Sequence, residues 1–338
     1  MANIGKILSG KEFNESHEGY KFVKILTDNL THHGFEYKEG LNIDNITFNP
    51  TGECSVGGLY FTDLNKMYMY ISYGNKFSYV TIPDEALVYI EEDKFKADMI
   101  TLINILPLSE LFLQNIQLCK LAVEQDGFAL EYVKNQTEEL CKLAVNQIGL
   151  ALKYVNNKTE ELCKLAVIQN GLAMIYVNNK TEDLCKLAVQ QNGLALGYVN
   201  NKTDELCKLA IQQNGSALGF VKEQTEELCK LAVQQDGYAL RFVRDQTDEI
   251  CKLAVEQNGN ALKYVKDQIE EICKLAVQQN RYALQYVKDQ TEEICKLAAQ
   301  QDGLALEFVR NKTDEICKLA IQQNDLALQF ANKQREEI

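Results

Sequence analysis

The chain has no Trp, only 3 Pro and 3 His in 338 residues, and fewer basic than acidic residues. Lys and Arg total 35 against 48 Asp and Glu, which gives a formal net charge of -13. Nucleic-acid binding needs clustered cationic charge, and none appears in the sequence. No stretch reaches the roughly 18 apolar residues of a membrane-spanning helix, and Met1–Gly10 lacks the apolar segment of a signal peptide. We therefore expect no nucleic acid and no membrane as partners, and a protein that is not secreted.

Cysteine is the residue that first reveals the organisation of the chain. Ten of the 11 Cys recur at intervals of 22 residues: Cys119, Cys141, Cys163, Cys185, Cys207, Cys229, Cys251, Cys273, Cys295 and Cys317. The surrounding sequence recurs with them, which marks an internal repeat. Zinc sites need paired Cys or His within a few residues, and equivalent positions of stacked repeats lie too far apart for disulfides. We therefore expect buried free thiols, no metal and no cofactor.

Each repeat is predicted to contain two short helices. Thr137–Gln147 is rich in helix formers, starts with a Thr that suits an N-cap, and spaces apolar residues such as Leu140 at helical intervals. Leu150–Asn156 repeats that spacing. Between the two halves most copies carry a Gly, such as Gly171, which we expect in the left-handed conformation that ends a helix.

Helices this short are unstable alone and need neighbours to bury their apolar faces. The predicted fold is therefore an all-α repeat solenoid with two short helices per 22-residue unit, preceded by a small α+β N-terminal domain. The expected domains are a leader over residues 1–105, a helical junction over 106–114 and the solenoid over 115–338. The solenoid would hold ten repeats and a C-terminal stub that begins another.

Two other folds share this period. The spacing from Leu162 to Leu172 fits a leucine-rich repeat, but the column that such a fold buries contains Asp126 and Asp236, whose carboxylates would be costly to bury. A period of 22 also equals twice the 11-residue repeat of a right-handed coiled coil. A Gly in eight of ten repeats disfavours that single long helix.

Two columns of the repeat do not vary. One is Lys in every copy, from Lys120 to Lys318, and the other is Gln, from Gln125 to Gln323. We expect each Lys to pair with the acidic residues that precede it on a solvated face. The Gln side chains are expected to form hydrogen bonds from one repeat to the next.

Other positions vary among otherwise nearly identical repeats, and they fall on the predicted second helix. Solenoids commonly bind partners along such extended surfaces. We therefore predict a protein partner that binds along one column, here called the variable column, and the alternative is neutral drift on a surface without a task. The predicted partner-binding residues are Glu131, Lys153, Ile175, Arg241, Lys263, Gln285 and Glu307, and the same column holds Gly197, Gly219 and Gln329.

Residues 1–105 lack the 22-residue repeat and contain all three His. β-rich runs predict strands at Met67–Tyr73, Tyr79–Ile82 and Ala86–Ile90. Turn signals occur at Gly57–Gly58 and at Pro83–Asp84. We expect Met99–Gln114 to form the helical junction, with a break at Pro107.

The segments His32–Asp44, Gly57–Thr62, Ile82–Ile90 and Lys94–Asp98 resemble the leader module of mimivirus-type giant-virus repeat proteins. In those proteins the module usually precedes ankyrin repeats, whereas this chain lacks the ankyrin Thr-Pro-Leu-His signature. Its array instead resembles a paired-helix repeat of unknown function found in giant viruses and some bacteria. The resemblance implies a non-catalytic interaction protein in the cytoplasm of an infected cell or in the virion.

The order His33, Tyr60 and Glu92 (or Glu91) is similar to the His–Tyr–Glu signature of ADP-ribosyltransferases. That resemblance implies that the His and Tyr would hold a nicotinamide nucleotide and that the Glu would orient the attacking hydroxyl. No Arg-rich or Gly-rich phosphate loop accompanies the three residues. We therefore predict that the chain is not an enzyme, with a degenerate ADP-ribosyltransferase-like N-terminal domain as the alternative function.

Overall fold

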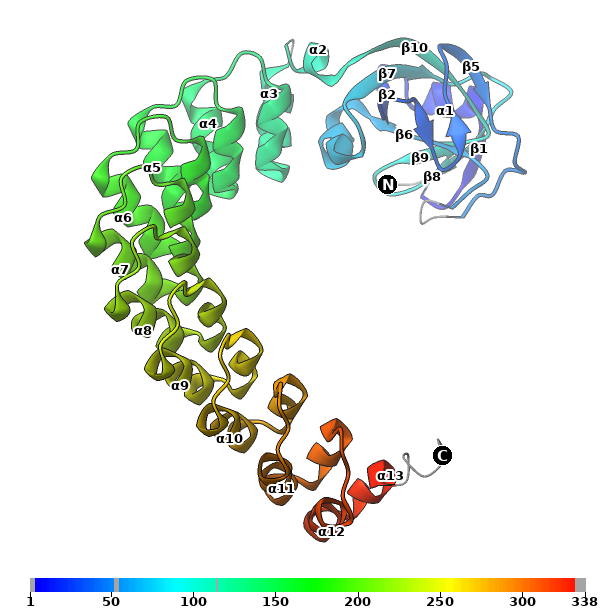
Figure 1. Ribbon diagram of the computed structural model, residues 1–338. Helices are drawn as coiled ribbons and strands as arrows, with labels where there is room; N and C mark the ends of the chain where they lie inside the picture. Colours follow the sequence, from blue (N-terminus) through cyan, green and yellow to red (C-terminus); the bar gives the residue numbers. More distant parts are fainter. Residues whose placement is uncertain (1–3, 52–54, 114, 332–338) are drawn as a thin grey trace. The chain divides into compact units, whose positions relative to one another are not determined.

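The computed structural model describes residues 4–51, 55–113 and 115–331. The chain forms two compact units, Met1–Gln169 and Asn170–Ile338. The first unit contains a sheet-rich N-terminal region and the first helical repeats, and the second contains helical repeats (Figure 1). The predicted domain boundaries stay predictions. The predicted C-terminal stub lies outside the described residues.

Eight strands of the N-terminal region form one antiparallel sheet in the order β1-β8-β9-β6-β2-β7-β10-β5, and β3 pairs with β4. The strands are β1 (Ile7–Ser9), β2 (Phe22–Leu26), β3 (Thr31–His32), β4 (Phe35–Glu36), β5 (Gly40–Ile43), β6 (Leu59–Asp63), β7 (Lys76–Thr81), β8 (Leu87–Ile90), β9 (Phe95–Ala97) and β10 (Met99–Pro107). The helices are α1 (Gly10–Ser16), the 3₁₀-helix η1 (Leu64–Tyr73) and α2 (Leu108–Phe112).

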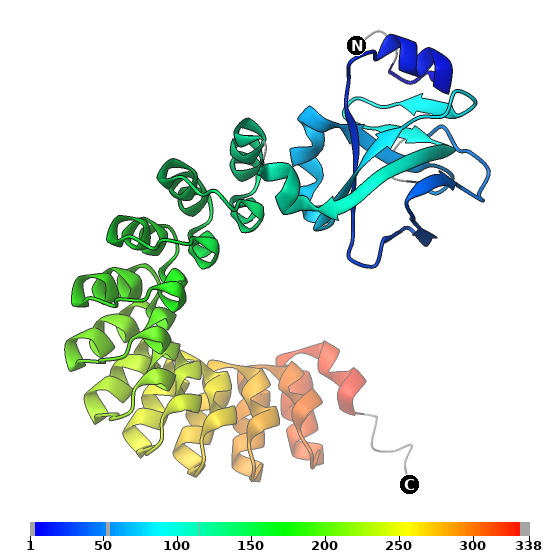
Figure 2. The same ribbon diagram turned by 90° about the horizontal axis from the view of Figure 1, so that it is seen from above.

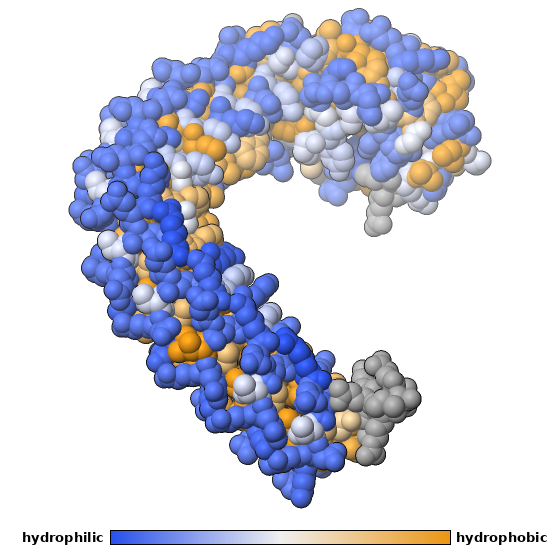
Figure 3. Space-filling model, viewed as in Figure 1, coloured by the Kyte–Doolittle hydropathy of each residue, from blue (hydrophilic) through white to orange (hydrophobic). Residues whose placement is uncertain are grey.

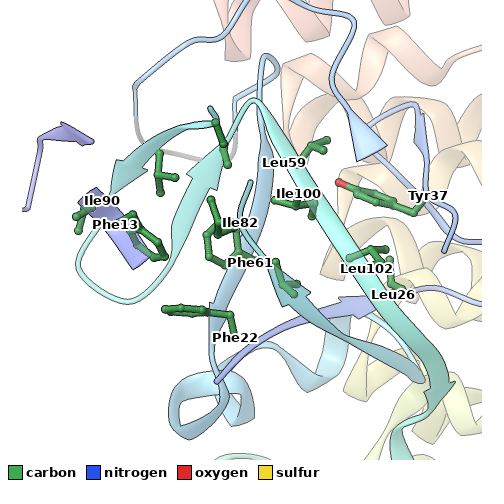
Figure 4. Packing of buried hydrophobic residues seen from close by; sticks show 14 residues of the cluster. Phe13, Phe22, Leu26, Tyr37, Leu59, Phe61, Ile82, Ile90, Ile100 and Leu102 are labelled. Carbon is green, nitrogen blue, oxygen red and sulfur yellow. The ribbon is translucent and has the colours of Figure 1, made fainter. Parts of the chain in front are cut away.

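The core of this region combines aliphatic side chains with a cluster of aromatic rings (Figure 4). Phe13 of α1 lies 5.1 Å from the ring of Phe22 on β2, and Phe61 on β6 lies 5.3 Å from Phe95, measured between ring centroids. Ser9 caps α1, because its side chain accepts from the Glu12 amide while the Glu12 carboxylate accepts from the Ser9 amide. The cap fixes α1 where Phe13 can bury its ring against the sheet.

Two predictions for the N-terminal region are wrong. Met67–Tyr73, expected as a strand, belongs to η1, which Asp63 caps by accepting from the Asn65 amide at 2.7 Å. Met67 and Ile71 are its buried side chains, and their spacing of four matches a helix rather than a strand. Residues 99–107, expected in a helical junction, form β10 between β5 and β7, and only α2 is helical. The predicted strands near Tyr79 and Ile90 are confirmed by β7 and β8.

The repeats contain an α-helix followed by a shorter 3₁₀-helix. The α-helices are α3 (Ile116–Gln125), α4 (Glu138–Gln147), α5 (Glu160–Gln169), α6 (Glu182–Gln191), α7 (Asp204–Gln213), α8 (Glu226–Gln235), α9 (Asp248–Gln257), α10 (Glu270–Gln279), α11 (Glu292–Gln301), α12 (Asp314–Gln323) and the terminal α13 (Leu328–Ala331). The 3₁₀-helices are η2 (Gly127–Tyr132), η3 (Gly149–Tyr154), η4 (Gly171–Tyr176), η5 (Gly193–Tyr198), η6 (Gly215–Phe220), η7 (Gly237–Phe242), η8 (Gly259–Tyr264), η9 (Arg281–Tyr286), η10 (Gly303–Phe308) and η11 (Asp325–Ala327).

The first helix starts as predicted. In α7, the Thr203 hydroxyl accepts from the Leu206 amide at 3.3 Å, and Asp204 and Glu205 occupy the first turn, where the helix dipole favours negative charge. Figure 2 shows the repeated helix pairs of the second unit side by side. No strand occurs among described residues 115–331, and each first helix ends after ten residues, so the leucine-rich and single-helix alternatives are both wrong.

The second helix and the glycine differ from the prediction. Gly193 does not end α6 in a left-handed turn. It is the first residue of η5, a six-residue 3₁₀-helix. Asn192 caps η5 from an extended conformation (φ -152°) by accepting from the Leu194 amide at 3.0 Å. Asn280, which precedes Arg281 in a repeat that lacks the Gly, is likewise extended. Positive φ at described glycines is confined to positions before residue 59.

Close approach between repeats explains the glycine instead. A Cβ atom on Gly193 would collide with the carbonyl oxygen of Ala210 in the next repeat. The Gly193 amide donates to the Gln213 Oε1 atom of that repeat at 2.6 Å, which confirms the prediction that the Gln column links repeats. The same bond joins Gly149 to Gln169, Gly171 to Gln191, Gly215 to Gln235, Gly237 to Gln257 and Gly303 to Gln323, at 2.5–2.7 Å.

Substitution of Gly193 by Ala should therefore destabilise the repeats by about 1–3 kcal/mol, because the new methyl group overpacks a backbone contact. Gly197→Ala is the matched control. The atoms nearest to its Cβ would be those of the Phe220 ring, which is 43% exposed and can turn away. Helix propensity should make that control neutral or slightly stabilising. Urea unfolding followed by circular dichroism measures both, and equal destabilisation would contradict the packing argument.

The Cys column lies in the interior, as expected. Nine of the described Cys are buried, Cys317 is partly exposed, and all ten carry free thiols. Burial raises the pKa of these thiols, to about 11 for Cys251. A thiol with a raised pKa holds little of the reactive thiolate at neutral pH.

Alkylation of the native protein with iodoacetamide, mapped by peptide mass spectrometry, should therefore label Cys317 faster than the other described cysteines. We expect Cys251 to remain unlabelled until the protein is unfolded. Rapid uniform labelling of the column in folded protein would contradict its burial.

Candidate functional site

The variable column lies on the short second helices, and all seven predicted partner-binding residues are exposed. Its basic members lie across aromatic rings. The Arg241 guanidinium is 4.5 Å from the ring centroid of Phe242, and the Lys153 ammonium is 4.8 Å from that of Tyr154. Such cation–π contacts hold long side chains against the surface while leaving their charge in water.

Within the second unit the column changes character from repeat to repeat. Ile175 is 46% exposed, and the rings of Tyr198 and Phe220 are partly exposed as well. Gly197 lies against the Phe220 ring and Gly219 against the Phe242 ring. Arg241 and Lys263 then supply positive charge. The repeats are largely hydrophilic in the view of Figure 3, with small hydrophobic patches. The column therefore offers a graded apolar and basic surface rather than a single pocket.

Eight of the ten lysines of the all-Lys column, all except Lys164 and Lys318, form ion pairs with described residues. Lys142 contacts Glu138 in its own helix and Glu161 in the next repeat, each at 2.9 Å. Lys230 makes the same double contact with Glu226 and Glu249. Exposed pairs of this kind contribute little stability individually. The carboxylates of these ion pairs neutralise the lysine charges, which disfavours an anion-binding role for this column.

A second set of glutamines, which was not predicted from the sequence, also joins neighbouring repeats. Gln246 donates through Nε2 to the carbonyl oxygens of Leu240 at 3.4 Å and Tyr264 at 3.0 Å, and its Oε1 accepts from the Lys266 amide at 2.9 Å. The equivalent residues Gln136, Gln224, Gln268 and Gln290 make corresponding contacts. Other repeats carry Lys at this position, as at Lys180, whose ammonium donates to the carbonyl oxygen of Tyr198. A column that alternates between Gln and Lys is typical of a variable surface position. In this structure both Gln246 and Lys180 donate to a backbone carbonyl oxygen of the next repeat.

The N-terminal region has its own cavity, between β2, β6 and η1. It is partly open and encloses about 590 Å³ of empty space, including the part open to solvent. Its lining residues are Val23, Lys24, Ile25, Thr27, His32, Tyr60, Phe61, Thr62, Tyr70, Tyr73 and Lys94. We call it the β2–β6 cavity.

Lys24 is the unusual member of this cavity, because it is only 3% exposed. Its ammonium donates to the Tyr60 carbonyl oxygen at 2.7 Å and lies 4.3 Å from the ring centroid of Tyr37. Burial lowers the pKa of Lys24 to about 7, and burial together with the Lys24 charge lowers the pKa of His32 to about 4. The sequence signal was a single Lys inside the apolar run from Phe22 to Leu26, and it was overlooked.

The three residues of the ADP-ribosyltransferase resemblance are not all brought together. His33 and Tyr60 line a second cavity, together with residues that include Asp44 and Gly58. Glu91 and Glu92 are not among the described residues that line it. Burial raises the pKa of the Glu91 carboxyl, which pairs with Lys94 at 3.5 Å. The geometry therefore supplies two members of the signature at one place and does not supply its acid.

The described part of the chain contains neither a metal-binding cluster nor a membrane-spanning helix. No group of three or more His, Cys, Asp or Glu in it is placed to hold a metal ion. None of its helices combines the length and the apolar character needed to cross a membrane.

Comparison with known proteins supports a relation to viral repeat proteins. Residues 181–225, 203–247, 225–270 and 247–291 match the model of a domain of unknown function, DUF4116. A putative ankyrin repeat protein of Acanthamoeba polyphaga mimivirus is 36% identical over 88 residues, which cover 24% of this chain and 44% of that protein. The chain thus spans less than half the length of this relative. No solved structure matches the chain.

The buried lysine makes stability depend on pH. Between the folded pKa of about 7 and the ordinary value of 10.5, the unfolded chain holds a proton that folded Lys24 has released. The free energy of unfolding should therefore rise from pH 7 to pH 8.5 by about 1.5 kcal/mol through this group. Lys24→Met should remove that rise. The lowered pKa of His32 acts below pH 6.5 and is not part of this window.

Urea unfolding at both pH values, for the wild-type protein and for Lys24→Met, measures the difference. Groups other than Lys24 contribute equally to both proteins, so they cancel in the comparison. An identical pH dependence in the two proteins would show that Lys24 is not buried in a low-polarity site.

Proposed function

We propose that this protein is a non-catalytic interaction scaffold whose repeats form a solenoid and whose variable column binds a viral or host protein. The observation that carries the proposal is the division of labour inside each repeat. Residues that join neighbouring repeats, such as Gln213 and Gly193, recur in nearly every copy, whereas the exposed residues of the second helix differ from copy to copy. Extended surfaces of repeat proteins commonly bind partners in this way.

The similarity to a mimivirus ankyrin repeat protein supports a protein-interaction role. It also supports the proposal that the protein acts in the cytoplasm of an infected cell or in the virion. Because Glu91 and Glu92 do not line the cavity of His33 and Tyr60, we do not propose the alternative ADP-ribosyltransferase-like activity.

Chemistry along the column indicates the kind of contact that we expect. Arg241 and Lys263 carry positive charge over aromatic rings, and Tyr198 and Phe220 offer exposed apolar surface nearby in the same unit. Arg and aromatic side chains are the types enriched where proteins bind each other most strongly. The proposed partner therefore presents both apolar and acidic side chains to this surface.

Reversal of four charges on the column tests the proposal. The variant Glu131→Lys, Lys153→Glu, Arg241→Glu, Lys263→Glu changes the net charge by -4, as does the control Lys164→Glu, Lys318→Glu on the exposed side of the first helices. Affinity capture with quantitative mass spectrometry, from lysates of infected cells, should show partners that bind the wild type and the control but are depleted at least about tenfold by the column variant.

Both variants should keep the circular dichroism spectrum and melting temperature of the wild type, because all six positions are exposed. If the column variant retains the partners while the control loses them, binding uses another face. If the two variants and the wild type capture the same proteins in equal amounts, the column is not a binding surface.

A further inference from the structure

The β2–β6 cavity combines a buried cation with several aromatic walls, and none of its lining residues belongs to the variable column. Tyr60 and Phe61 come from β6, Tyr70 and Tyr73 from η1, and His32 from β3. The cavity is partly open, so a ligand could reach these side chains from solvent. The proposed interaction surface makes no use of these residues, so a function of the cavity would be a separate one.

The aromatic side chains are held in place. The Tyr70 hydroxyl donates to the Asp93 carboxylate, and the rings of Tyr70 and Tyr73 lie 6.1 Å apart. The His32 ring stands at 89° to the Tyr73 ring at 6.2 Å. Fixed rings around a cavity favour a flat ligand, which can stack on one ring and meet the edge of another.

Lys24 supplies the charge of the cavity. Its ammonium has a carbonyl oxygen and an aromatic face as partners, and no carboxylate in the described part of the chain lies within ion-pair distance of it. Keeping an ammonium buried without a counter-ion is costly. A negatively charged ligand would supply the missing counter-charge, whereas a cationic ligand would be repelled by Lys24 and by Lys94, which also lines the cavity.

We propose that the β2–β6 cavity binds a small planar organic anion, such as an aromatic carboxylate or sulfonate, whose charge is held by Lys24 and whose ring lies among Tyr60, Tyr70 and Tyr73. The recognition is a charge-assisted hydrogen bond from the buried ammonium combined with stacking. Binding is non-covalent, so no covalent bond of the ligand forms or breaks.

The test uses the full-length protein and a pair of fluorescent probes with the same ring system. The anion 8-anilinonaphthalene-1-sulfonate carries the charge, and N-phenyl-1-naphthylamine lacks it. Lys24→Met removes the ammonium at nearly constant length. Lys21→Met is the matched control, because Lys21 is exposed and does not line the cavity.

We expect one saturable site for the sulfonate probe, weakened at least about tenfold by Lys24→Met and unchanged by Lys21→Met. The neutral probe should bind both variants to within about twofold, because stacking does not need the charge. Equal sulfonate binding by the wild type and Lys24→Met overturns the proposal. An equal loss of both probes in Lys24→Met, or no saturable site in the wild type, also overturns it.

A stability measurement separates ligand binding from a structural role of Lys24. Because the ammonium lacks an acidic partner, Lys24→Met at pH 7 should melt no lower than the wild type. If that variant fails to fold, Tyr73→Ala replaces it, since Tyr73 is 54% exposed. It should weaken both probes at least about threefold with an unchanged melting temperature, and unchanged binding of both probes would overturn the proposal.

Discussion

A hydrogen bond from the glycine amide of one repeat to the glutamine side chain of the next is the contact on which the repeat region depends. It places the start of one 3₁₀-helix against the end of the following α-helix, as from Gly193 to Gln213. The amide is one of the first-turn donors that a helix cannot satisfy itself. The glutamine satisfies it, and the absent Cβ lets the two backbones meet. Register between these repeats is thus set by polar contacts, whereas Arg281 and Asp325 stand in place of the glycine in two other repeats.

This constraint explains why variation is confined to a few positions. Leu, Cys, Ala and Val fill the interior, Gln and Gly join the repeats, and Lys bridges acidic residues of adjacent helices. A substitution at the Gly or Gln column disturbs two repeats at once. The exposed side chains of the second helix take no part in the Gly–Gln contacts between repeats. Ile175, Arg241 and Glu307 can therefore differ without structural cost. A surface that is free to vary on a rigid frame is suited to selection for binding.

The repeat period, the first helices, their Thr caps, the buried free thiols and the Gln links could be predicted because each depends on residues close in sequence or on equivalent columns. The role of Gly193 could not, since its reason is the Ala210 carbonyl of another repeat rather than its own φ. The strand β10 was mistaken for a junction because its two partner strands lie far away in sequence. Lys24 escaped notice because burial on both faces of β2 depends on the whole sheet.

Hydrogen exchange at the glycine amides tests the central claim most directly. In the full-length protein, nuclear magnetic resonance should show the amide hydrogens of Gly171, Gly193, Gly215 and Gly237 protected to a degree similar to those in the middle of the α-helices. Gln213→Ala should accelerate exchange at Gly193, whereas Gln212→Ala, at the adjacent exposed position, should leave it unchanged. Rapid exchange at these glycines in the wild type, or equal protection in both variants, would contradict the account.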